Sequence, residues 1–269
     1  MTTRLEREIV GDAISKVPPD RVLEVGLGGG RITPVLRSRF SEYVGIDVTL
    51  AFLQPGRLAD PTSPPYFAAD VHELPFATGA FRAVVMIRVY NFLVDPARAL
   101  RELARVLAPG GILMMSYHPV PSLGTLTEDL RHLLASERNP GFEPVTFRRR
   151  EIHQPRRDRV LREVRRAGFT VVGERVTGLE DNRFGRRLPM GSLRALSSLT
   201  SAWSILPHRF LQATTPGEAP TDLPDRKDVV VCPKCRAPLD LGGTPPREHV
   251  TCPGCRAIFP VRSGILDFR

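Results

Sequence analysis

Short apolar runs alternate along the chain with segments whose apolar residues recur every three or four positions. The runs that have the length and composition of buried strands lie at residues 21–26, 43–49, 65–71, 81–90, 112–117, 169–176 and 208–215. Helical spacing marks residues 1–17 and 159–168, and a further helix is expected after Asp95, a good N-cap residue. We expect "APGG" (108–111) to end that helix. Strands that alternate with helices predict a parallel sheet covered on both faces.

The pattern divides the chain into two folded parts joined by a linker. Residues 1–217 carry the alternation, which residues 118–158 interrupt with prolines and a charged patch. Residues 218–228 are rich in proline and acidic side chains, so they are predicted to be a linker. Residues 229–269 form the second part and contain every cysteine.

An apolar stripe at residues 193–206 is interpreted as part of the core. Two alternatives are the lining of a pocket for an apolar substrate and contact with a membrane surface. The polar face of the stripe is rich in serine and threonine rather than basic residues, which disfavours the membrane.

The composition supports a folded protein without a membrane span. Hydrophobic residues make up 42% of the chain, which is enough for a packed core. No apolar run reaches the roughly 18 residues that cross a bilayer. The charged N-terminus lacks the apolar segment of a signal peptide, so we predict a cytoplasmic protein.

Basic residues are in excess, with 38 Lys and Arg and a net charge of +9, and nearly all of them are arginine. The densest group lies at residues 148–166, where nine arginines accompany three acids. One interpretation is a phosphate-binding surface for RNA or for a phosphorylated substrate. The other is the solvated face of a helix whose buried side holds Val160, Leu161 and Val164.

The glycine-rich stretch "LEVGLGGG" follows the first predicted strand and opens a helix. Gly26, Gly28 and Gly30 would let the backbone approach a ligand closely. The dinucleotide-binding pattern needs a small residue where Arg31 stands. Glu24 would repel a pyrophosphate and attract an ammonium group, so the loop favours a different cofactor.

Two further acids lie at the ends of the next two strands. At Asp47 a carboxylate can accept hydrogen bonds from both hydroxyls of a ribose, and at Asp70 it can accept one from an adenine amino group. Together with Glu24 they form a row at the edge where α/β sheets bind ligands. S-adenosylmethionine has a matching ammonium group, ribose and adenine, and no phosphate.

The stretches "LEVGLGGG", "GIDVT", "DVHELPF", "LRELARVLAPGG" and "REVRRAGFTVV" resemble class I S-adenosylmethionine-dependent methyltransferases, in particular the quinone- and sterol-modifying branch. The resemblance implies a Rossmann-like, seven-stranded, mostly parallel sheet with helices on both faces and an antiparallel last strand. It also implies a substrate cap at residues 118–158. The predicted cofactor-binding residues are Glu24, Gly26, Gly28, Gly30, Asp47, Asp70, Val71 and Arg88. The chain departs from the family at Arg82, where an aspartate is common, and at "RVYNF" (88–92).

Methyl transfer from an activated cofactor mainly requires that the two reactants be positioned, and a base is optional. The candidate catalytic residues follow the fourth and fifth strands and are His118, Tyr90 and Tyr117. The other interpretation of His118, which its place before Pro119 favours, is an exposed loop histidine.

The cysteines Cys232, Cys235, Cys252 and Cys255 form two Cys-x-x-Cys pairs separated by 16 residues. Four thiolates in two such knuckles suit a structural, tetrahedral zinc ion; a redox dithiol and an iron–sulfur cluster are weaker alternatives. The tail "CPKCRAPL … CPGCRAIFPVRSGILDF" also resembles the small zinc-ribbon activator subunit of tRNA-, ribosome- and release-factor-modifying methyltransferases. That resemblance implies a ribbon that docks in cis on the preceding domain and stabilises it.

These features predict a methyltransferase of a small-molecule or lipid-like acceptor with a fused zinc ribbon. One alternative is a methyltransferase of tRNA, rRNA or a translation factor, which the arginine group and the ribbon favour. A second is a non-catalytic binding protein with the same fold, which Arg82 and "RVYNF" suggest.

Overall fold

The centre of the fold is a parallel sheet whose strands are buried on both faces. β1 (Arg21–Val25) and β4 (Phe81–Met86) are buried at every position, and β2 (Glu42–Asp47) at all but its first. β3 (Tyr66–Ala68) and β5 (Leu107–Tyr117) flank them. The computed structural model describes residues 2–59, 66–119, 144–147, 150–153, 155–177, 208–241 and 248–269.

Two later strands complete the predicted seven-stranded sheet. β9 (His208–Thr214) lies between β5 and β8 (Thr170–Thr177) and is antiparallel to both. The strand order β3-β2-β1-β4-β5-β9-β8 therefore has its last strand in sequence as the antiparallel member. This confirms the predicted fold class.

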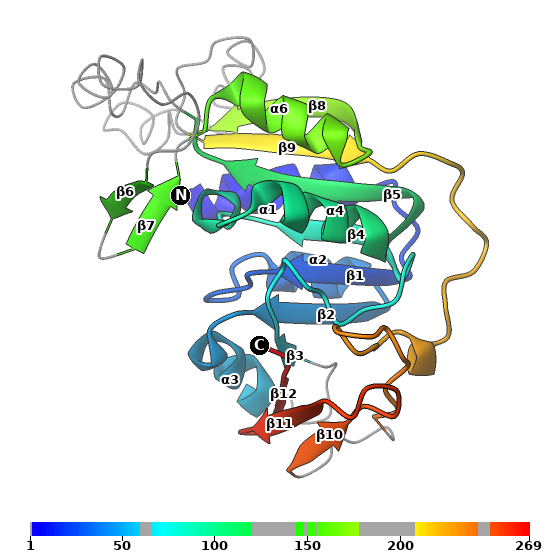
Figure 1. Cartoon of the computed structure of the whole chain (residues 1–269). Helices are drawn as coiled ribbons and strands as arrows, with labels where there is room; N and C mark the ends of the chain where they lie inside the picture. Colours follow the sequence, from blue (N-terminus) through cyan, green and yellow to red (C-terminus); the bar gives the residue numbers. More distant parts are fainter. Residues whose placement is uncertain are drawn as a thin grey trace.

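The cysteine-containing tail extends this sheet beyond β3. β12 (Ile265–Asp267) pairs in parallel with β3, and β11 (Ile258–Arg262) and β10 (His249–Thr251) continue outward as antiparallel strands. The result is one ten-stranded sheet, with the tail at its lower end in Figure 1.

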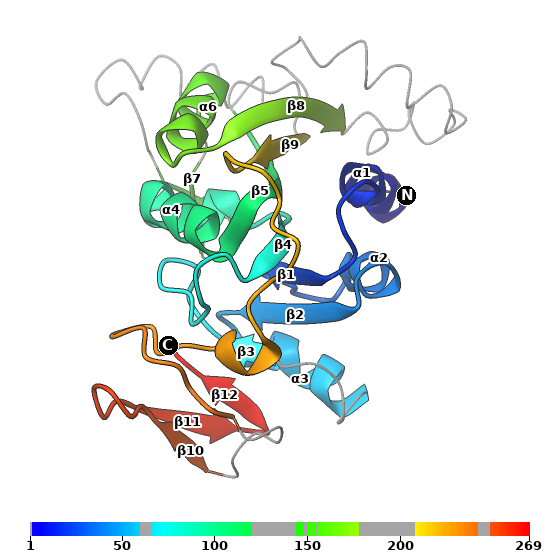
Figure 2. The same cartoon turned by 90° about the vertical axis from the view of Figure 1, so that its right-hand side faces the viewer.

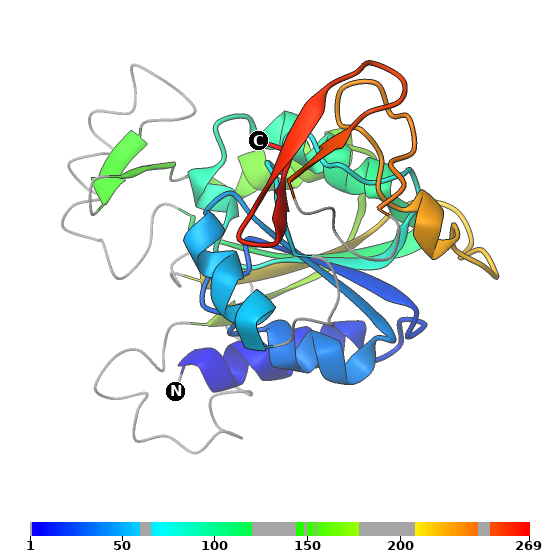
Figure 3. The ribbon, with the colours of Figure 1, turned by 90° about the horizontal axis from the view of Figure 1, so that it is seen from below.

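Helices cover both faces of the sheet, as Figures 2 and 3 show. One face carries α1 (Thr2–Ile14), α2 (Thr33–Arg39) and α3 (Leu50–Ala59). The other carries α4 (Pro96–Val106) and α6 (Arg157–Arg166). The core under α4 and α6 also contains Val230, Phe259 and Phe268 of the tail, so the tail shares a core with the larger part.

The helix expected after Asp95 is α4, which begins at Pro96. The Asp95 carboxylate accepts a hydrogen bond from the Arg98 amide at 2.9 Å and caps the helix as predicted. The helix ends at Val106, just before "APGG", and Leu107 already pairs with Phe81 of β4. β5 therefore begins at Leu107, earlier than the strand expected at residues 112–117, and the "APGG" stretch lies within it.

The linker crosses the amino ends of the central strands. The Arg82 guanidinium donates to the Asp20 carboxylate at 2.7 Å and to the Thr221 carbonyl at 2.9 Å. Arg21 donates to the Pro224 carbonyl at 3.1 Å. Both arginines are buried, so they fix the linker to the sheet before the short η5 helix (Arg226–Asp228). Arg82, the departure from the family pattern, thus has a structural role at the end of the sheet opposite to the carboxylate row.

Part of the predicted substrate cap is described as a hairpin of β6 (Pro144–Phe147) and β7 (Arg150–His153). The rest of that insertion between residues 120 and 143, and the apolar stripe at 193–206, lie outside the described residues. In the part of the chain that is described, no helix is both long and apolar enough to cross a bilayer.

Candidate functional site

The glycine loop leaves β1 in a conformation that requires glycine. Gly26 has a φ of +70°, and a Cβ atom there would lie 2.2 Å from Cγ2 of Val89. Among the described residues, no atom lies within 4 Å of a Cβ built on Gly29, so that part of the loop faces open space. The loop is therefore closed by Val89 on one side and open to a ligand on the other.

Glu24 lies next to the loop, on the penultimate residue of β1, and is 4% exposed. Its Oε2 atom accepts hydrogen bonds from the Thr33 hydroxyl at 2.7 Å and the Tyr43 hydroxyl at 2.6 Å. Burial raises the pKa of the Glu24 carboxyl, and the two hydrogen bonds oppose part of that rise. Within the described residues Oε1 accepts no hydrogen bond, so this oxygen is the one that a cationic ligand can contact.

Asp47 ends β2 and connects the glycine loop to the following turn. Its carboxylate accepts hydrogen bonds from the Gly28 amide at 3.1 Å and from the Thr49 amide at 2.8 Å. Each oxygen therefore keeps further acceptor capacity at the carboxyl edge of the sheet.

Asp70 follows β3, and its side chain is 53% exposed. Oδ1 accepts from the His72 amide at 2.9 Å and faces the His72 Nδ1 atom at 2.5 Å. His72 Nε2 accepts from the Asp95 amide at 3.2 Å, so the proton of a neutral ring is on Nδ1. The hydrogen bond from His72 lowers the pKa of the Asp70 carboxyl. Val71, between them, is buried.

Arg88 reaches the same edge from the loop after β4, with a φ of +61°. Its guanidinium contacts Oε1 of Glu6 at 2.7 Å, and Arg31 of the glycine loop contacts Oε2 of Glu6 at 3.3 Å. Glu6 is 1% exposed on α1 and was missed in the sequence analysis. The sequence signal for Glu6 was an acidic residue on the apolar side of that helix. Its partners Arg31 and Arg88 are distant in sequence, so the contacts themselves could not be predicted.

The phenols of Tyr90 and Tyr117 are buried and face α6 and β8. The Tyr90 hydroxyl donates to Glu163 at 2.6 Å, and the Tyr117 hydroxyl donates to Glu174 at 2.6 Å. Burial and the neighbouring carboxylates raise the pKa of both phenols, so neither is suited to accept a proton. These contacts favour a packing role, and the assignment of the two tyrosines to catalysis stays a prediction.

His118 follows β5 and is held by Asn91, in the 3-10 helix η1 (Tyr90–Phe92). The Asn91 amide oxygen accepts from the His118 backbone at 2.9 Å, and its Nδ2 atom donates to the His153 carbonyl at 2.6 Å. The His118 ring lies 4.2 Å from that of His208. Burial, His208 and the Arg88 charge lower the pKa of His118 to about 3. At neutral pH the imidazole is uncharged.

The described arginines of α6 mostly pair with acids. Arg159 contacts Glu163 at 2.8 Å, and Arg162 contacts Asp158 at 2.5 Å. Arg157 donates to Glu174 at 2.7 Å. These pairs support the interpretation of the 157–166 segment as the solvated side of a helix whose other side is buried.

The four cysteines form one cluster. Their sulfur atoms all lie within 4.8 Å of one another, and the Cys232–Cys255 and Cys235–Cys252 pairs are separated by 3.6 Å and 3.4 Å. Both knuckles have the same local geometry, because the backbone amides of Arg236 and Arg256 donate to the carbonyls of Cys232 and Cys252. Four thiolates at 2.3 Å from a tetrahedral zinc ion would be about 3.8 Å apart, which this cluster fits.

Comparisons with known proteins relate the chain to methyltransferases. Residues 23–115 match the family model described as a methyltransferase domain. The demethylmenaquinone methyltransferase of Renibacterium salmoninarum is 34% identical over 45% of this chain and 51% of its own length. That of Corynebacterium urealyticum is 32% identical over 65% of this chain and 79% of its own length.

A solved chain from the complex between the Haloferax volcanii Trm112 methyltransferase activator and a putative methyltransferase has a TM-score of 0.54. It is 16% identical, and the match covers 78% of this chain and 90% of that one. At this identity the likeness shows the fold alone. The chain spans about half the length of the first curated relatives it matches. The match to the Corynebacterium relative covers most of that protein, and the chain therefore belongs to the family of S-adenosylmethionine-dependent methyltransferases.

Proposed function

We propose that this chain binds S-adenosylmethionine at the carboxyl edge of the sheet and transfers its methyl group to an apolar, quinone-like acceptor. The observation that carries the proposal is the row of carboxylates Glu24, Asp47 and Asp70 around an open glycine loop. When bound, the cofactor supplies a methyl group on a sulfonium that is already activated for displacement. The protein then has to hold and orient the reactants.

Each part of the row fits one part of the cofactor. Oε1 of Glu24 would accept a hydrogen bond from the ammonium group of the cofactor. Arg88 and Arg31 carry two positive charges against the one negative charge of Glu6, and the excess would attract the cofactor's carboxylate. Asp47 would accept from the ribose hydroxyls. Asp70, oriented by His72, would accept from the adenine amino group.

Exposed apolar side chains around this edge support an apolar acceptor. Val48 and Phe52 follow Asp47 and are 55% and 42% exposed. Phe92 and Val94 follow β4 and are 44% and 85% exposed. They follow strands that end at the carboxyl edge, where exposed apolar side chains can contribute to a binding surface. Curated relatives named demethylmenaquinone methyltransferases suggest the quinone class.

Titration calorimetry with S-adenosylmethionine tests the cofactor step directly. We expect one site per chain in the wild type and a loss of binding in Asp47→Ala. Transfer of a labelled methyl group to a short-chain demethylmenaquinone then tests the acceptor. Absence of binding at millimolar cofactor would support instead a non-catalytic protein with this fold.

The alternative acceptor is RNA. The tail favours it, because the tail resembles the activator subunit of methyltransferases that modify tRNA and ribosomes. The ion pairs on α6 reduce the charge available for phosphates, so we place this second. Binding to bulk tRNA and rRNA across a salt series separates the two, because phosphate contacts weaken steeply as salt rises. A flat response, with transfer to the quinone, would exclude RNA.

We propose that the four cysteines hold one structural zinc ion. The sulfur positions fit a tetrahedral site without an open position, so its contribution is to folding rather than to chemistry. Metal analysis of the purified chain should give one zinc per molecule.

A further inference from the structure

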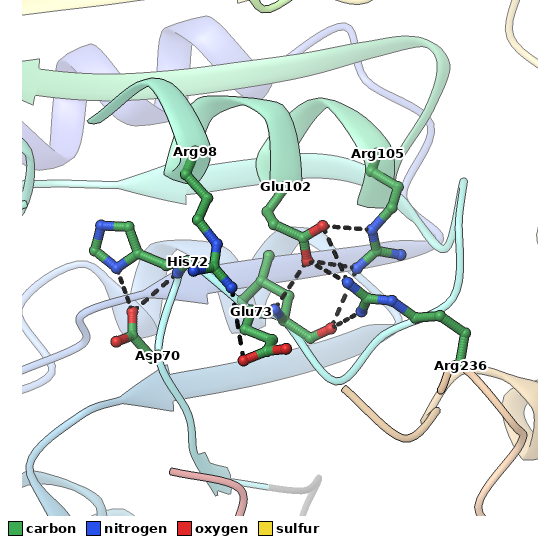
Figure 4. Close-up of polar contacts among 8 residues, drawn as sticks. Asp70, His72, Glu73, Arg98, Glu102, Arg105 and Arg236 are labelled. Atoms are coloured by element: carbon green, nitrogen blue, oxygen red, sulfur yellow. Dashed lines mark hydrogen bonds and ion pairs between the residues drawn. The ribbon is translucent and has the colours of Figure 1, made fainter. Parts of the chain in front are cut away.

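The first cysteine knuckle contacts the segment that carries Asp70. Arg236, four residues after Cys232, donates to the Leu74 carbonyl at 2.7 Å and contacts both oxygens of Glu102 at 3.2 Å. Arg236 has a φ of +64°, and its side chain extends toward Glu102 of α4 (Figure 4). The contact therefore joins the ribbon to the larger part of the chain.

Glu102 is the centre of this network, which Figure 4 shows. Its carboxylate also accepts from Arg105 at 2.8 Å and from the Leu74 amide at 3.0 Å. Burial would raise the pKa of Glu102, but the hydrogen bonds and charges of Arg105 and Arg236 lower it. Glu102 is thus ionised near neutral pH and binds two arginines and a backbone amide at once.

These contacts fix both backbone polar groups of Leu74, a fully buried residue. The next residues are held by the tail as well, because the Val231 amide donates to the Pro75 carbonyl at 3.0 Å and the Ala77 amide to the Val229 carbonyl at 2.9 Å. On the amino-terminal side of Leu74, residues 70–73 form a turn in which the Glu73 amide donates a hydrogen bond to the Asp70 carbonyl at 3.1 Å. The position of Asp70 therefore depends on Leu74.

A second contact from the tail reaches the turn after Asp47. Arg269 donates to the Val48 carbonyl at 2.6 Å and is itself held by Asp267 at 2.6 Å. The Phe268 amide donates to the Ala68 carbonyl at 2.8 Å, two residues before Asp70. The tail thus supports two of the three turns that carry the carboxylate row.

We infer that Arg236 is a positioning residue for the cofactor site, on which it acts through the turn from Asp70 to Leu74. The inference rests on the proposed function of the carboxylate row. It goes beyond a general stabilising role, because it assigns the effect to one side chain that acts on the Asp70–Leu74 turn.

The chain contains a matched control for this residue. Arg256 occupies the same place in the second knuckle, with a φ of +60° and the same amide contact to the first cysteine. Within the described residues its side chain makes no hydrogen bond or ion pair. Arg236→Ala and Arg256→Ala therefore disturb equivalent knuckle positions, and only Arg236→Ala removes a contact with Leu74.

Calorimetry with S-adenosylmethionine and amide hydrogen exchange test the inference on the full zinc-loaded chain. Arg236→Ala should bind the cofactor about fivefold more weakly and show faster exchange at residues 70–75, while Arg256→Ala should match the wild type. Arg236→Lys should recover part of the affinity, since a lysine can still donate to the Leu74 carbonyl.

Equal cofactor affinity in the two alanine variants would overturn the inference while leaving the proposed function intact. A weakening that appears in Arg256→Ala as well, or that accompanies loss of zinc, would assign the effect to the knuckle and not to Arg236. A wild type that binds no cofactor would instead refute the proposed function, and the exchange data would still report on the turn.

Discussion

The buried carboxylate of Glu24 makes both the folding stability and the ligand affinity depend on pH, and the two change in opposite directions. Burial raises the pKa of Glu24, so the folded chain binds a proton there more readily than the unfolded chain does. The contribution of Glu24 to folding therefore increases as pH falls and decreases as pH rises through its raised pKa. A cationic ligand needs the ionised form, so its affinity changes in the other direction.

We predict that affinity for S-adenosylmethionine falls on acidification and that the fall begins above the usual range of a glutamate. Asp70, with its lowered pKa, stays ionised in that range and does not contribute. Calorimetry across a series from about pH 5 to 8 measures the effect. Glu24→Gln should bind weakly with a flat profile, and an unchanged profile in this variant would assign the titration to another group.

The contact between Gly26 and Val89 gives a second prediction at this scale. Gly26→Ala should lower the free energy of unfolding by about 1–3 kcal/mol, because its Cβ would clash with Val89 and the backbone has a positive φ. Val89→Ala in the same chain should restore part of the loss, which denaturant unfolding of all three variants measures. If Gly26→Ala lowers the free energy of unfolding equally in the wild-type and the Val89→Ala backgrounds, backbone strain alone is responsible.

At the scale of elements, the alternation of strands and helices predicted a parallel sheet covered on both faces, because the central strands are continuous apolar runs. The seven strands and the antiparallel last strand were implied by the family resemblance. The N-cap at Asp95 followed from local chemistry alone. Contacts between distant elements were not predictable, since Glu6 with Arg88 and Arg82 with Thr221 are ordinary surface-type residues in the sequence. The "APGG" stretch lies within β5 as an irregularity, because the register with β4 passes from Phe81–Leu107 directly to Ala83–Ile112.

The attachment of the linker to the sheet gives the prediction at the scale of elements. Arg82 and Arg21 hold the linker as a strap across the amino ends of the central strands. Arg82→Ala removes the hydrogen bonds to Asp20 and to the Thr221 carbonyl, so the linker at residues 218–228 should become accessible to protease. The free energy of unfolding should fall by about 1–3 kcal/mol, since Asp20 is partly exposed and can be solvated when its partner is lost. Lys227→Ala, at an exposed pair with Asp225, is the control and should cleave like the wild type. Equal cleavage of the two variants would contradict a strap held by Arg82.

At the scale of the whole molecule, the ribbon and the sheet share one core and one set of strands. Phe268 packs against Phe67 of β3 with ring centroids 5.8 Å apart, and Phe67 packs against Phe76 at 5.7 Å. Cys232 and Cys252 belong to the same buried cluster as Leu100 of α4. A change at the cysteine cluster is therefore transmitted to the larger part through direct packing.

We predict that Cys252→Ser lowers the melting temperature of the entire chain, by roughly 10 °C or more, and that the chain unfolds in one transition before and after the change. Loss of the metal leaves about 40 residues with too little core to stay folded, so β12 separates from β3. The exposed edge of β3 can then pair with other chains, and light scattering should show aggregation below the wild-type transition. Lys234→Ala, an exposed change within the same knuckle, should leave the transition unchanged. A separate early transition of the ribbon, with the main transition unmoved, would show that the two parts fold independently despite their shared sheet.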